Sequence, residues 1–503
     1  MSLRSFTLYD MFKRNAAVYR NETALLTEEN RRITFKELFD EVNVVAGWLG
    51  GRGVRKGDRI AVLAKNYPQY FTLMGSIAAV GAIMVPINFR LTPEEIGHQL
   101  SNTEPVMLFI DPDFEKMASG LSSTCPSIKE IVTFGSRPGS FTPYGSLLRN
   151  RPGNALPISD EDPYVIIHTA AIQGKPRGAV LSHRNVVSCN IQTISVMGLT
   201  PRDSYLNILP VFHIAGLAAC MAMMYAGGKN VILSKFDPHM AVRIIDQEKV
   251  SVIGDFPPIL TLLLDAHRDG EFSLFPLKHV LGVELPDTIK RFEGLGHGQF
   301  WLAYGQTETM GLTSMCPNAE RPGSAGKPGP LVDLKIVDDV DREVPAGQTG
   351  EIVVRGPLVF QGYWKEEELT SYTFREGWHH TGDRGRLDED GYLWFAGRKA
   401  EKELIKPGGE NVYPVEVEKV ILEHPGIQEV SVIGVPDPKF GEGIKAVCVL
   451  KANMKLTDQE LIDFVGGRIA RYKKPGYVTF VDSLPKKEDG SIDRDKVKAL
   501  YGK

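Results

Sequence analysis

Two kinds of apolar pattern alternate along most of this chain, and their alternation limits the possible folds more than any single motif does. Residues 35–53 carry apolar side chains at helical spacing and end on a glycine, whereas the next run, 59–66, has the short apolar character of a buried strand. Strand-like runs return at 104–111 and 229–236, and a helical pattern follows at 239–248. Strands that alternate with helices in this way indicate α/β layers.

The chain has 503 residues, which is more than one hydrophobic core normally organises, so we expect at least two domains. Between residues 330 and 396 the apolar runs become short and turn-bounded, which favours a mostly β subdomain. A charged stretch at 399–403 then leads into an α+β pattern of ordinary domain size. The sequence therefore predicts a large domain at 1–398, with layered α/β subdomains and a β subdomain, and a small α+β domain at 399–503.

The composition is ordinary for a soluble globular protein, and we expect the protein to be cytoplasmic. The formal net charge of −4 argues against a polyanion-binding surface, so we expect no nucleic-acid partner. The five cysteines show no metal-ligand spacing and are expected to be reduced thiols. The N-terminus lacks the apolar run of a secretory signal. The longest apolar segment, 70–89, is interrupted by Gly75, Gly81 and Pro86, so it predicts a buried helix running into a strand and not a membrane span.

A loop rich in glycine and basic residues, HTAAIQGKPRGAVLSH, occupies residues 168–183. We expect it to lie between a strand and a helix that begins near its end. Backbone N–H groups in such a loop can hold phosphate oxygens, and a cation can screen their charge. Gly174, Lys175 and Arg177 are the candidate phosphate-binding residues. Considered alone, an ordinary basic turn explains the same residues.

The segment YGQTE, at residues 304–308, brings three useful chemical groups together. Tyr304 and Gly305 form a turn whose aromatic face suits a purine. Thr307 offers a hydroxyl to an α-phosphate, and Glu308 offers a hard oxygen ligand for Mg²⁺. The alternative for the isolated segment is a polar loop with a structural tyrosine.

Two further candidates follow in the predicted β subdomain. Asp383 ends the segment HTGD and begins a strand-like pattern, and a carboxylate at a strand end can bind both hydroxyls of a ribose. Arg398 closes the run GYLWFAGR. Taken separately, a turn-forming aspartate and a surface arginine on a linker are serious alternatives.

In this order and at these separations, the segments resemble the AMP-forming acyl-CoA synthetase family of adenylating enzymes. The resemblance covers nearly the whole chain. It implies a large domain that holds ATP and the acyl group, and a small mobile domain that acts as a lid and reorients between two half-reactions. It also implies Mg²⁺ on Glu308, coenzyme A as the second substrate, and the ribose roles of Asp383 and Arg398.

The resemblance implies roles for other residues as well. Gly282, Val283 and Glu284 match the turn beside the adenine. His213 matches the histidine of the acyl pocket, where we expect it to line or gate the pocket and not to transfer a proton. The apolar neighbourhood that includes Ile214 and Trp301, with Ala303 before Tyr304, favours a monocarboxylic acid with a hydrocarbon body.

In the small domain the resemblance concerns the hinge and the path of coenzyme A. Lys402 and Glu403 match the basic and acidic hinge pair, although two additional residues follow Arg398. Gly408 and Gly409 match the segment that lines the pantetheine tunnel after the small domain has rotated.

Two positions depart from the family pattern. The first half of the phosphate loop reads Ala-Ala-Ile-Gln at 170–173 where the family has Ser-Gly-Thr-Thr, so we expect a weaker grip on pyrophosphate. Ser491 stands where the family has a catalytic lysine that bridges the carboxylate and the α-phosphate.

The resemblance therefore predicts an ATP-dependent carboxylic acid–CoA ligase that acts through acyl-AMP. The two departures keep open a rival function, that of a binding or regulatory protein that retains AMP or acyl-CoA but has lost ligase turnover. An enzyme that performs only the thioester half-reaction is the intermediate possibility. The retained set of Tyr304, Thr307, Glu308, Asp383 and Arg398 favours the enzyme, because a scaffold has no physical need for it.

Overall fold

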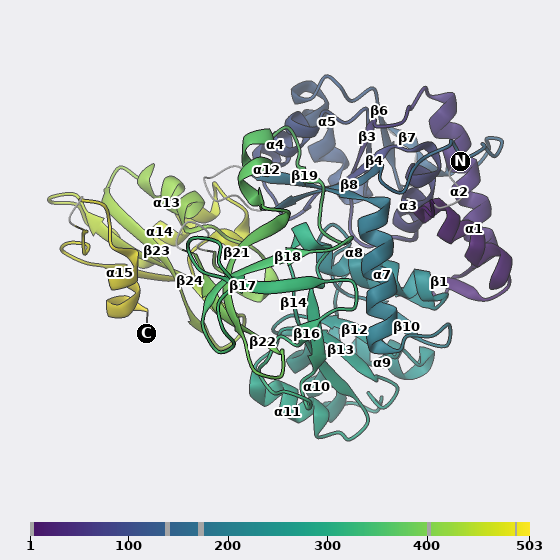
Figure 1. Ribbon diagram of the computed structural model, residues 1–503. Coiled ribbons are helices and arrows are strands. Elements are labelled where there is room, and N and C mark those ends of the chain that lie inside the picture. The colour runs from purple at the N-terminus through teal and green to yellow at the C-terminus, as the bar shows by residue number, and fades with distance from the viewer. Residues whose placement is uncertain (1–4, 136–140, 170–175, 400–403, 488–489, 503) are drawn as a thin grey trace.

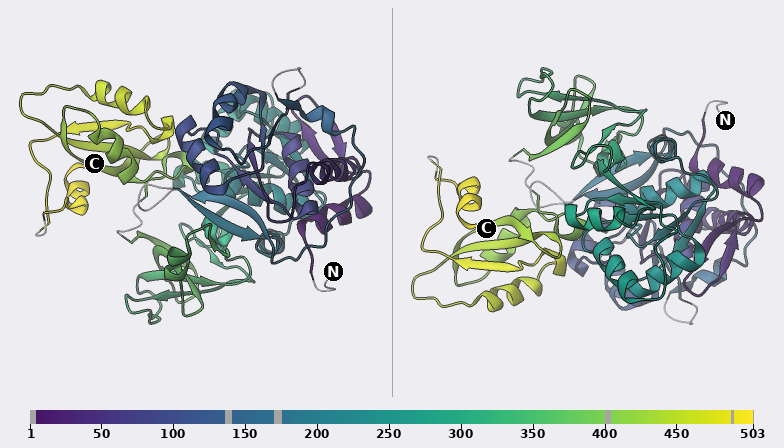
Figure 2. Two further views of the ribbon diagram at one scale, coloured as in Figure 1. Left: turned by 90° about the horizontal axis from the view of Figure 1, so that it is seen from above. Right: turned by 90° about the horizontal axis from the view of Figure 1, so that it is seen from below.

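The computed structural model describes residues 5–135, 141–169, 176–399, 404–487 and 490–502. The chain forms a large α/β body with a β-rich layer against it, and its C-terminal part forms a separate lobe at one side (Figures 1 and 2). The N-terminus lies on the far side of the large body from that lobe (Figure 1). This mixed α/β arrangement, with a large N-terminal and a small C-terminal part, is the predicted fold class.

The first large sheet has eight strands in the order β19-β9-β8-β4-β3-β5-β6-β7. Its central strands are parallel, while β8 pairs with β9, and β9 with β19, in antiparallel register. The strands are β3 (Arg59–Leu63), β4 (Ile83–Pro86), β5 (Met107–Ile110), β6 (Glu130–Thr133), β7 (Thr142–Pro143), β8 (Pro163–Thr169), β9 (Arg177–Ser182) and β19 (Gly362–Tyr363).

The second large sheet has nine strands in the order β16-β15-β14-β13-β12-β10-β11-β1-β2. Strands β14, β13, β12, β10, β11 and β1 run parallel, so their C-terminal ends reach one common edge. The strands are β1 (Thr23–Thr27), β2 (Arg32–Thr34), β10 (Ser204–Asn207), β11 (Lys229–Ile232), β12 (Val252–Asp255), β13 (His279–Gly282), β14 (Gln299–Tyr304), β15 (Ser314–Pro317) and β16 (Lys327–Pro328).

Helices cover both large sheets, and one apolar core cluster joins residues of the two sheets through α2, α3, α7 and α8. A second cluster packs α9, α10 and α11 on the nine-stranded sheet, and a third packs α4 and α5 on the eight-stranded sheet. The helices of this body are α1 (Leu8–Val18), α2 (Phe35–Gly51), α3 (Pro68–Val80), α4 (Pro93–Thr103), α5 (Glu115–Thr124), α6 (Tyr144–Leu147), α7 (His183–Met197), α8 (Ile214–Ala226), α9 (Pro238–Glu248), α10 (Ile259–Asp269) and α11 (Pro286–Glu293).

The predicted β subdomain is a five-stranded antiparallel sheet with one short helix. Its turn-rich sequence gives strands that return on themselves without crossover helices. The elements are β17 (Asp333–Val337), β18 (Gly350–Arg355), α12 (Glu367–Thr373), β20 (Phe374–Arg375), β21 (Trp378–Leu387) and β22 (Leu393–Arg398).

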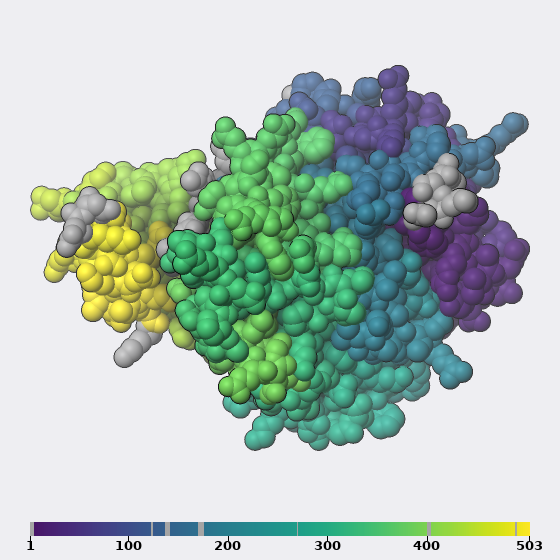
Figure 3. Space-filling view, viewed as in Figure 1, coloured from purple at the N-terminus to yellow at the C-terminus, as the bar shows by residue number. Residues whose placement is uncertain are grey.

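The C-terminal lobe has its own three-stranded sheet, β23-β24-β25, and its own apolar cluster. Space-filling atoms show it as a distinct mass beside the large body (Figure 3). Its elements are α13 (Pro414–Leu422), β23 (Ile427–Asp437), β24 (Gly441–Leu450), α14 (Asp458–Gly466), β25 (Tyr477–Phe480) and α15 (Arg494–Tyr501).

The apolar segment at 70–89 forms most of α3 and then β4, as its interrupted pattern predicts, and its core residues are fully buried. Among the described helices, none is both long and apolar enough to cross a bilayer.

Two local expectations are wrong. The glycine-rich loop does not connect a strand directly to a helix: β9 intervenes, because the run RGAVLS pairs antiparallel with β8 before α7 begins at His183. Asp383 does not lie at a strand end either. It lies inside β21, at a point where the register shifts against both neighbouring strands.

Candidate active site

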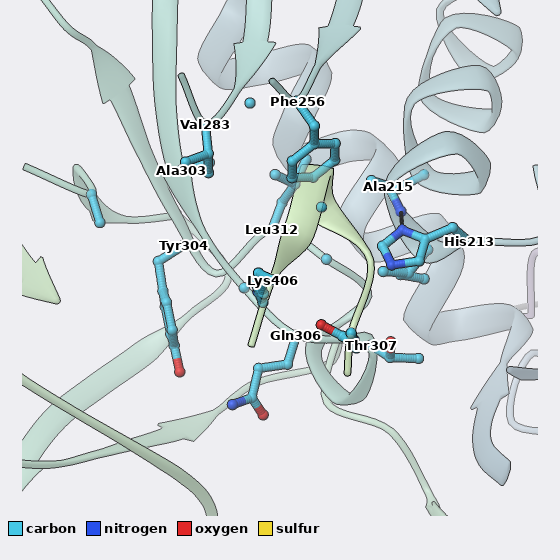
Figure 4. Close-up of a pocket in the computed structure, with 18 of the residues that line it drawn as sticks. His213, Ala215, Phe256, Val283, Ala303, Tyr304, Gln306, Thr307, Leu312 and Lys406 are labelled. Carbon is cyan, nitrogen blue, oxygen red and sulfur yellow. Dashed lines mark hydrogen bonds between the residues drawn. The ribbon is translucent and has the colours of Figure 1, made fainter. Parts of the chain in front are cut away.

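A cavity of about 550 Å³ opens where β12, β13 and β14 reach their C-terminal ends. Gly254, Gly282 and Tyr304 mark those three strand ends in its wall, and α8 forms the opposite side. Figure 4 shows side chains from both the large body and the C-terminal lobe turned into this space. The C-terminal edge of a parallel sheet is where open α/β folds bind their ligands.

One side of the cavity is built on the contact between the end of β14 and the five-stranded sheet. Tyr304 Oη donates a hydrogen bond to Asp383 Oδ2 at 2.9 Å. Arg398 is the cross-strand partner of Asp383 in the β21–β22 register, and its Nε lies 3.5 Å from Asp383 Oδ1. The predicted aromatic residue, carboxylate and arginine therefore meet at one place.

Gln306 completes this group, and its role is not one that the sequence indicated. Its Nε2 donates to Asp383 Oδ2 at 2.5 Å and to the carbonyl of Thr381 at 2.9 Å. Asp383 is only 5% exposed, so these donors fix the orientation of a carboxylate that still faces the cavity. Burial, followed by the charge of Asp383, raises the pKa of Tyr304 well above its usual range, so Tyr304 remains a donor.

The segment after Tyr304 turns sharply into the cavity wall. Gly305 is required there, because a Cβ at this position would lie 2.1 Å from the carbonyl oxygen of Gly311. A single 3₁₀ turn, Thr307–Thr309, then presents Thr307 and Glu308 to the cavity. Glu308 Oε1 accepts a hydrogen bond from Tyr363 Oη at 2.7 Å.

The opposite wall is largely apolar and comes from α8. His213 is the N-cap of this helix, because its Nδ1 accepts a hydrogen bond from the N–H of Ala215 at 3.3 Å. Burial lowers the pKa of His213, so the ring is neutral near pH 7 and carries its proton on Nε2. The small residues Ala215, Ala218 and Ala219 of α8 leave room between the helix and the sheet. Other apolar residues that line this space are Ile214, Leu281, Leu302, Ala303 and Leu312.

Trp301 does not line the described wall of this cavity, contrary to expectation. It pairs with Leu281 across β13–β14, two residues before Ala303, and its Nε1 donates to His279 Nδ1 at 3.0 Å. Its side chain is held by His279, although its cross-strand neighbour Leu281 lines the cavity.

The turn after β13 contributes two of its three predicted residues. Gly282 and Val283 line the cavity, while the buried Glu284 is not among the lining residues. Burial raises the pKa of Glu284, which fits its position behind the wall.

The C-terminal lobe closes the cavity with the segment that precedes α13. Lys406, Gly409, Asn411 and Tyr413 line it, and Figure 4 shows Lys406 among the side chains of the large body. Gly409 lies against Phe256 so closely that a Cβ would be 2.6 Å from the ring. Gly408 does not line the cavity, but its N–H donates to the carbonyl of Phe440 at 3.1 Å.

Ser491 is not part of the described cavity wall. Its carbonyl accepts a hydrogen bond from the N–H of Lys487 at 2.8 Å, beside an isolated bridge between Lys486 and Ile492. Arg177, at the start of β9, lies 6.0 Å from the ring centre of Tyr363. Gly174, Lys175, Lys402 and Glu403 lie outside the described residues.

Sequence comparison identifies the family. The family model for the AMP-binding enzyme matches residues 12–364, and that for the AMP-binding enzyme C-terminal domain matches residues 416–491. This chain belongs to the AMP-binding enzymes.

Its relatives in this family include acid–CoA ligases. Indoleacetate–CoA ligase from Aromatoleum aromaticum is 32% identical over 99% of this chain and 98% of its own length. A double mutant of o-succinylbenzoate CoA synthetase (MenE) from Bacillus subtilis, bound with its product analogue OSB-NCoA, is 27% identical and superimposes with a TM-score of 0.85 over 97% of this chain and 98% of its own. MenE in complex with the acyl-adenylate intermediate OSB-AMP is also 27% identical and gives a TM-score of 0.71 over 99% of each chain.

The residues of this AMP-binding enzyme suit an adenylate. Asp383 has four acceptor positions on its two oxygens, and protein donors leave room for ribose hydroxyls. The Tyr304 and Phe395 rings lie 6.3 Å apart along the same wall and offer apolar faces to a base. The second carboxylate oxygen of Glu308 is of the type that could coordinate a hard cation such as Mg²⁺.

Two further carboxylates, Glu351 and Asp341, lie near this site and pair with basic side chains. Glu351 Oε2 lies 2.8 Å from Lys399 Nζ and 3.1 Å from His380 Nδ1, while Oε1 accepts from the N–H of Gly382 at 2.9 Å. Asp341 is paired with Arg375 beside them. Since an ammonium and a guanidinium already balance these carboxylates, we assign the group to holding the HTGD segment and not to binding a metal.

Proposed function

We propose that this protein is an ATP-dependent carboxylic acid–CoA ligase that forms an acyl-AMP intermediate and uses Mg²⁺ as its metal ion. The supporting observation is that one cavity joins the ribose-binding group of Tyr304, Asp383 and Arg398 to an apolar compartment beside α8. The substrate carboxylate would therefore meet the α-phosphate between the two, near Thr307.

In the first half-reaction, a carboxylate oxygen of the acid attacks the α-phosphorus and pyrophosphate leaves. Asp383 and Gln306 would hold the ribose, and Tyr304 would stack on the base. Thr307 would donate its hydroxyl to the α-phosphate, since it lines the cavity where the two compartments meet. Mg²⁺ on Glu308 would neutralise charge on the phosphates.

In the second half-reaction, the thiol of coenzyme A attacks the acyl carbon and AMP leaves. The described orientation of the C-terminal lobe supports this step. Gly409, on the segment expected to line the path of coenzyme A, packs on Phe256 at the cavity, whereas Ser491, at the position of the adenylation lysine, is outside the described cavity wall. The higher TM-score to MenE bound with OSB-NCoA than to MenE with OSB-AMP supports the same assignment, since identity and coverage are nearly equal for the two.

The apolar compartment favours an acid with an aromatic or alkyl body. The charged residues in the described cavity wall are Glu308, Asp383, Arg398 and Lys406, which line the ribose and phosphate side or come from the C-terminal lobe. Ala218 and Ala219 leave space that larger residues on α8 would fill. The activity of the relative from Aromatoleum on indoleacetate points to an aryl acid of similar size.

The rival function, a binding protein without ligase turnover, is not supported by these comparisons, because the relatives are ligases that carry the same two family segments. An enzyme limited to the thioester half-reaction differs from the proposed one only in the rate of adenylation.

The test is to mix the protein with ATP, Mg²⁺ and single acids, and to measure pyrophosphate release and acyl-CoA by mass spectrometry. Indoleacetate, phenylacetate and octanoate are the test acids, and succinate is the control with a second charge. We expect thioester formation with at least one apolar acid and none with succinate. Filling the compartment with Ala218→Phe should raise the KM for the acid and leave the affinity for AMP unchanged. Absence of both pyrophosphate release and thioester with every acid would contradict the proposal.

A further inference from the structure

Lys473 is a lysine buried between the two parts of the molecule. It belongs to the 3₁₀ turn Arg471–Lys473 of the C-terminal lobe, and only 4% of it is exposed. Its Nζ lies 2.7 Å from Glu95 Oε1, on α4 of the large body, and 2.7 Å from Glu416 Oε2, on α13 of its own lobe. One ammonium is thus shared by a carboxylate from each part.

Each of the two carboxylates also has a partner that does not depend on Lys473. Glu95 Oε2 accepts from the N–H of Thr92 at 2.8 Å and caps α4. Glu416 Oε1 accepts from the N–H of Tyr413 at 3.0 Å and caps α13. If the lobe turned away, Lys473 would keep Glu416 and Glu95 would keep its helix cap. The Glu95–Lys473 contact can therefore break without leaving an unpaired charge in either part.

Other contacts surround this ion pair at the same interface. Arg90 of the large body forms an ion pair with Glu410 of the lobe. Ala470 joins the apolar cluster of Ile96 and Leu100 on α4, and Tyr472 packs against that cluster. The interface is therefore a packed contact between α4 and the lobe.

The ion pair also lies beside the active site. A second cavity of about 60 Å³ is lined by Lys473 and Glu416 of the lobe and by His213 and Thr307 of the large body. Burial lowers the pKa of the Lys473 ammonium, but the charges of Glu416 and Glu95 outweigh burial and raise it. The lysine is thus charged while it joins α4 to a lobe that reaches the reacting groups.

We propose that Glu95 and Lys473 are positioning residues that hold the C-terminal lobe in the orientation for thioester formation. The proposal rests on the proposed function, in which the lobe adopts another orientation for adenylation. In the described orientation the ion pair forms while Gly409 and Lys406 line the cavity. An ion pair between the lobe and α4 that is made in one orientation would stabilise that orientation and act on one half-reaction.

The test compares the two half-reactions in Glu95→Gln. Glutamine can still cap α4 through its amide oxygen but carries no charge for Lys473. We expect CoA-dependent consumption of synthetic acyl-AMP to slow by roughly tenfold, because a buried ion pair has been broken. Pyrophosphate release from ATP and the acid should stay the same or rise. Glu95→Asp, which retains the carboxylate, should restore part of the thioester rate.

Glu104→Gln is the matched control. Glu104 is the C-cap of the same helix, and its carboxylate pairs with Lys365 of the large body at 2.8 Å, without contact to the lobe. The control should leave both half-reactions unchanged. Amide hydrogen exchange supplies a readout that does not depend on turnover, and residues 93–103 and 471–473 should exchange faster in Glu95→Gln than in Glu104→Gln.

The behaviour of Glu95→Gln decides whether the proposal holds. An unchanged thioester rate and unchanged exchange in Glu95→Gln would overturn it, as would an equal fall of both half-reactions with a lower unfolding temperature. A selective fall in the thioester half-reaction with faster exchange would support it. If the unchanged protein forms no thioester, the proposed function fails, while the exchange comparison still shows whether Glu95 holds the lobe.

Discussion

Tyr304 Oη lies 2.9 Å from Asp383 Oδ2, so a hydrogen bond joins the nine-stranded sheet to the five-stranded sheet at the cavity. Tyr304 ends β14, and Asp383 lies at a register shift in β21. The contact matters for function because it fixes a carboxylate whose remaining acceptor positions face the proposed ribose site.

The first prediction tests this contact. Tyr304→Phe keeps the aromatic ring but removes the donor to Asp383, so we expect AMP to bind more weakly by about 1 kcal/mol, or roughly fivefold. Asp383→Ala should weaken AMP binding further, because it removes the ribose acceptor itself. Isothermal titration calorimetry with AMP and a non-hydrolysable acyl-AMP analogue measures both effects.

Tyr363→Phe is the control for that experiment. It removes a similar hydroxyl in the same neighbourhood, but its partner is Glu308 at 2.7 Å and not Asp383. AMP affinity should be unchanged in this variant, whereas the Mg²⁺ concentration needed for adenylation should shift. Equal AMP affinity in the unchanged protein, Tyr304→Phe and Asp383→Ala would remove the case for a ribose site here.

The second prediction concerns the phosphate loop, whose residues 170–173 lie outside the described residues. Ala-Ala-Ile-Gln lacks the hydroxyls of Ser-Gly-Thr-Thr, and each missing bond to a charged phosphate is worth roughly 1.5–3 kcal/mol if nothing replaces it. We therefore expect ATP to bind little more tightly than AMP. Replacing the four residues with Ser-Gly-Thr-Thr should strengthen ATP binding and leave AMP binding unchanged. Much tighter binding of ATP than of AMP in the unchanged protein would show that other groups compensate.

The short motifs and their order along the chain singled out Tyr304, Thr307, Glu308, Asp383 and Arg398, and all five line one cavity. The sequence could not show that Gln306 donates to Asp383, because the two residues are 77 positions apart and are brought together only by the contact between two sheets. The same limit applies to Lys473 and Glu95, which are 378 residues apart and belong to no common motif.

Two predictions are wrong because a short local pattern does not determine how the segment packs or pairs in the fold. The apolar character of Trp301 predicts a pocket residue, but polarity does not determine where a side chain is directed, and this one pairs with His279 outside the described cavity wall. The glycine-rich loop predicts a strand-to-helix connection, but its short run RGAVLS forms β9. Fold class and the element sequence were predictable because they depend on periodicity over many residues.

The third prediction concerns pH and the carboxylate of Glu351, which is 4% exposed. Burial raises its pKa, but the contacts with His380, Lys399 and the N–H of Gly382 outweigh burial and lower the pKa to about 2. A lowered pKa means that the ionised form stabilises the folded state above the unfolded-state pKa of about 4.3, and that this stabilisation is lost as the pH falls toward 2.

Glu351→Gln should therefore destabilise the protein at pH 7 by about 3 kcal/mol, because it removes that ionised group and leaves Lys399 without its carboxylate partner. The difference from the unchanged protein should shrink between pH 4.5 and about 2. Urea unfolding followed by circular dichroism at several pH values measures the difference.

Asp333→Asn is the control. The carboxylate of Asp333 pairs with Arg355 on the exposed face of the same sheet, so this variant should show little effect at any pH. A constant difference across this range would mean that Glu351 acts by packing and not by charge.

The last prediction concerns Ser491, where the family has a lysine. Adenylation concentrates negative charge between the incoming carboxylate and the α-phosphate, and a fixed ammonium stabilises that transition state more than the separated reactants. Serine supplies no charge, so we expect slow formation of acyl-AMP in the unchanged protein.

Ser491→Lys should raise the rate of pyrophosphate release, by tenfold for each ~1.4 kcal/mol of added transition-state stabilisation. The exposed position of Ser491, on a turn before α15, should allow lysine without loss of stability. Thioester formation from supplied acyl-AMP should change little, because the described orientation places Ser491 outside the cavity wall. Ser491→Met, which adds a long side chain without charge, separates the effect of the cation from that of length. Fast adenylation in the unchanged protein with no gain from lysine would mean that another group supplies the charge, and Ser491 would then place no limit on the first half-reaction.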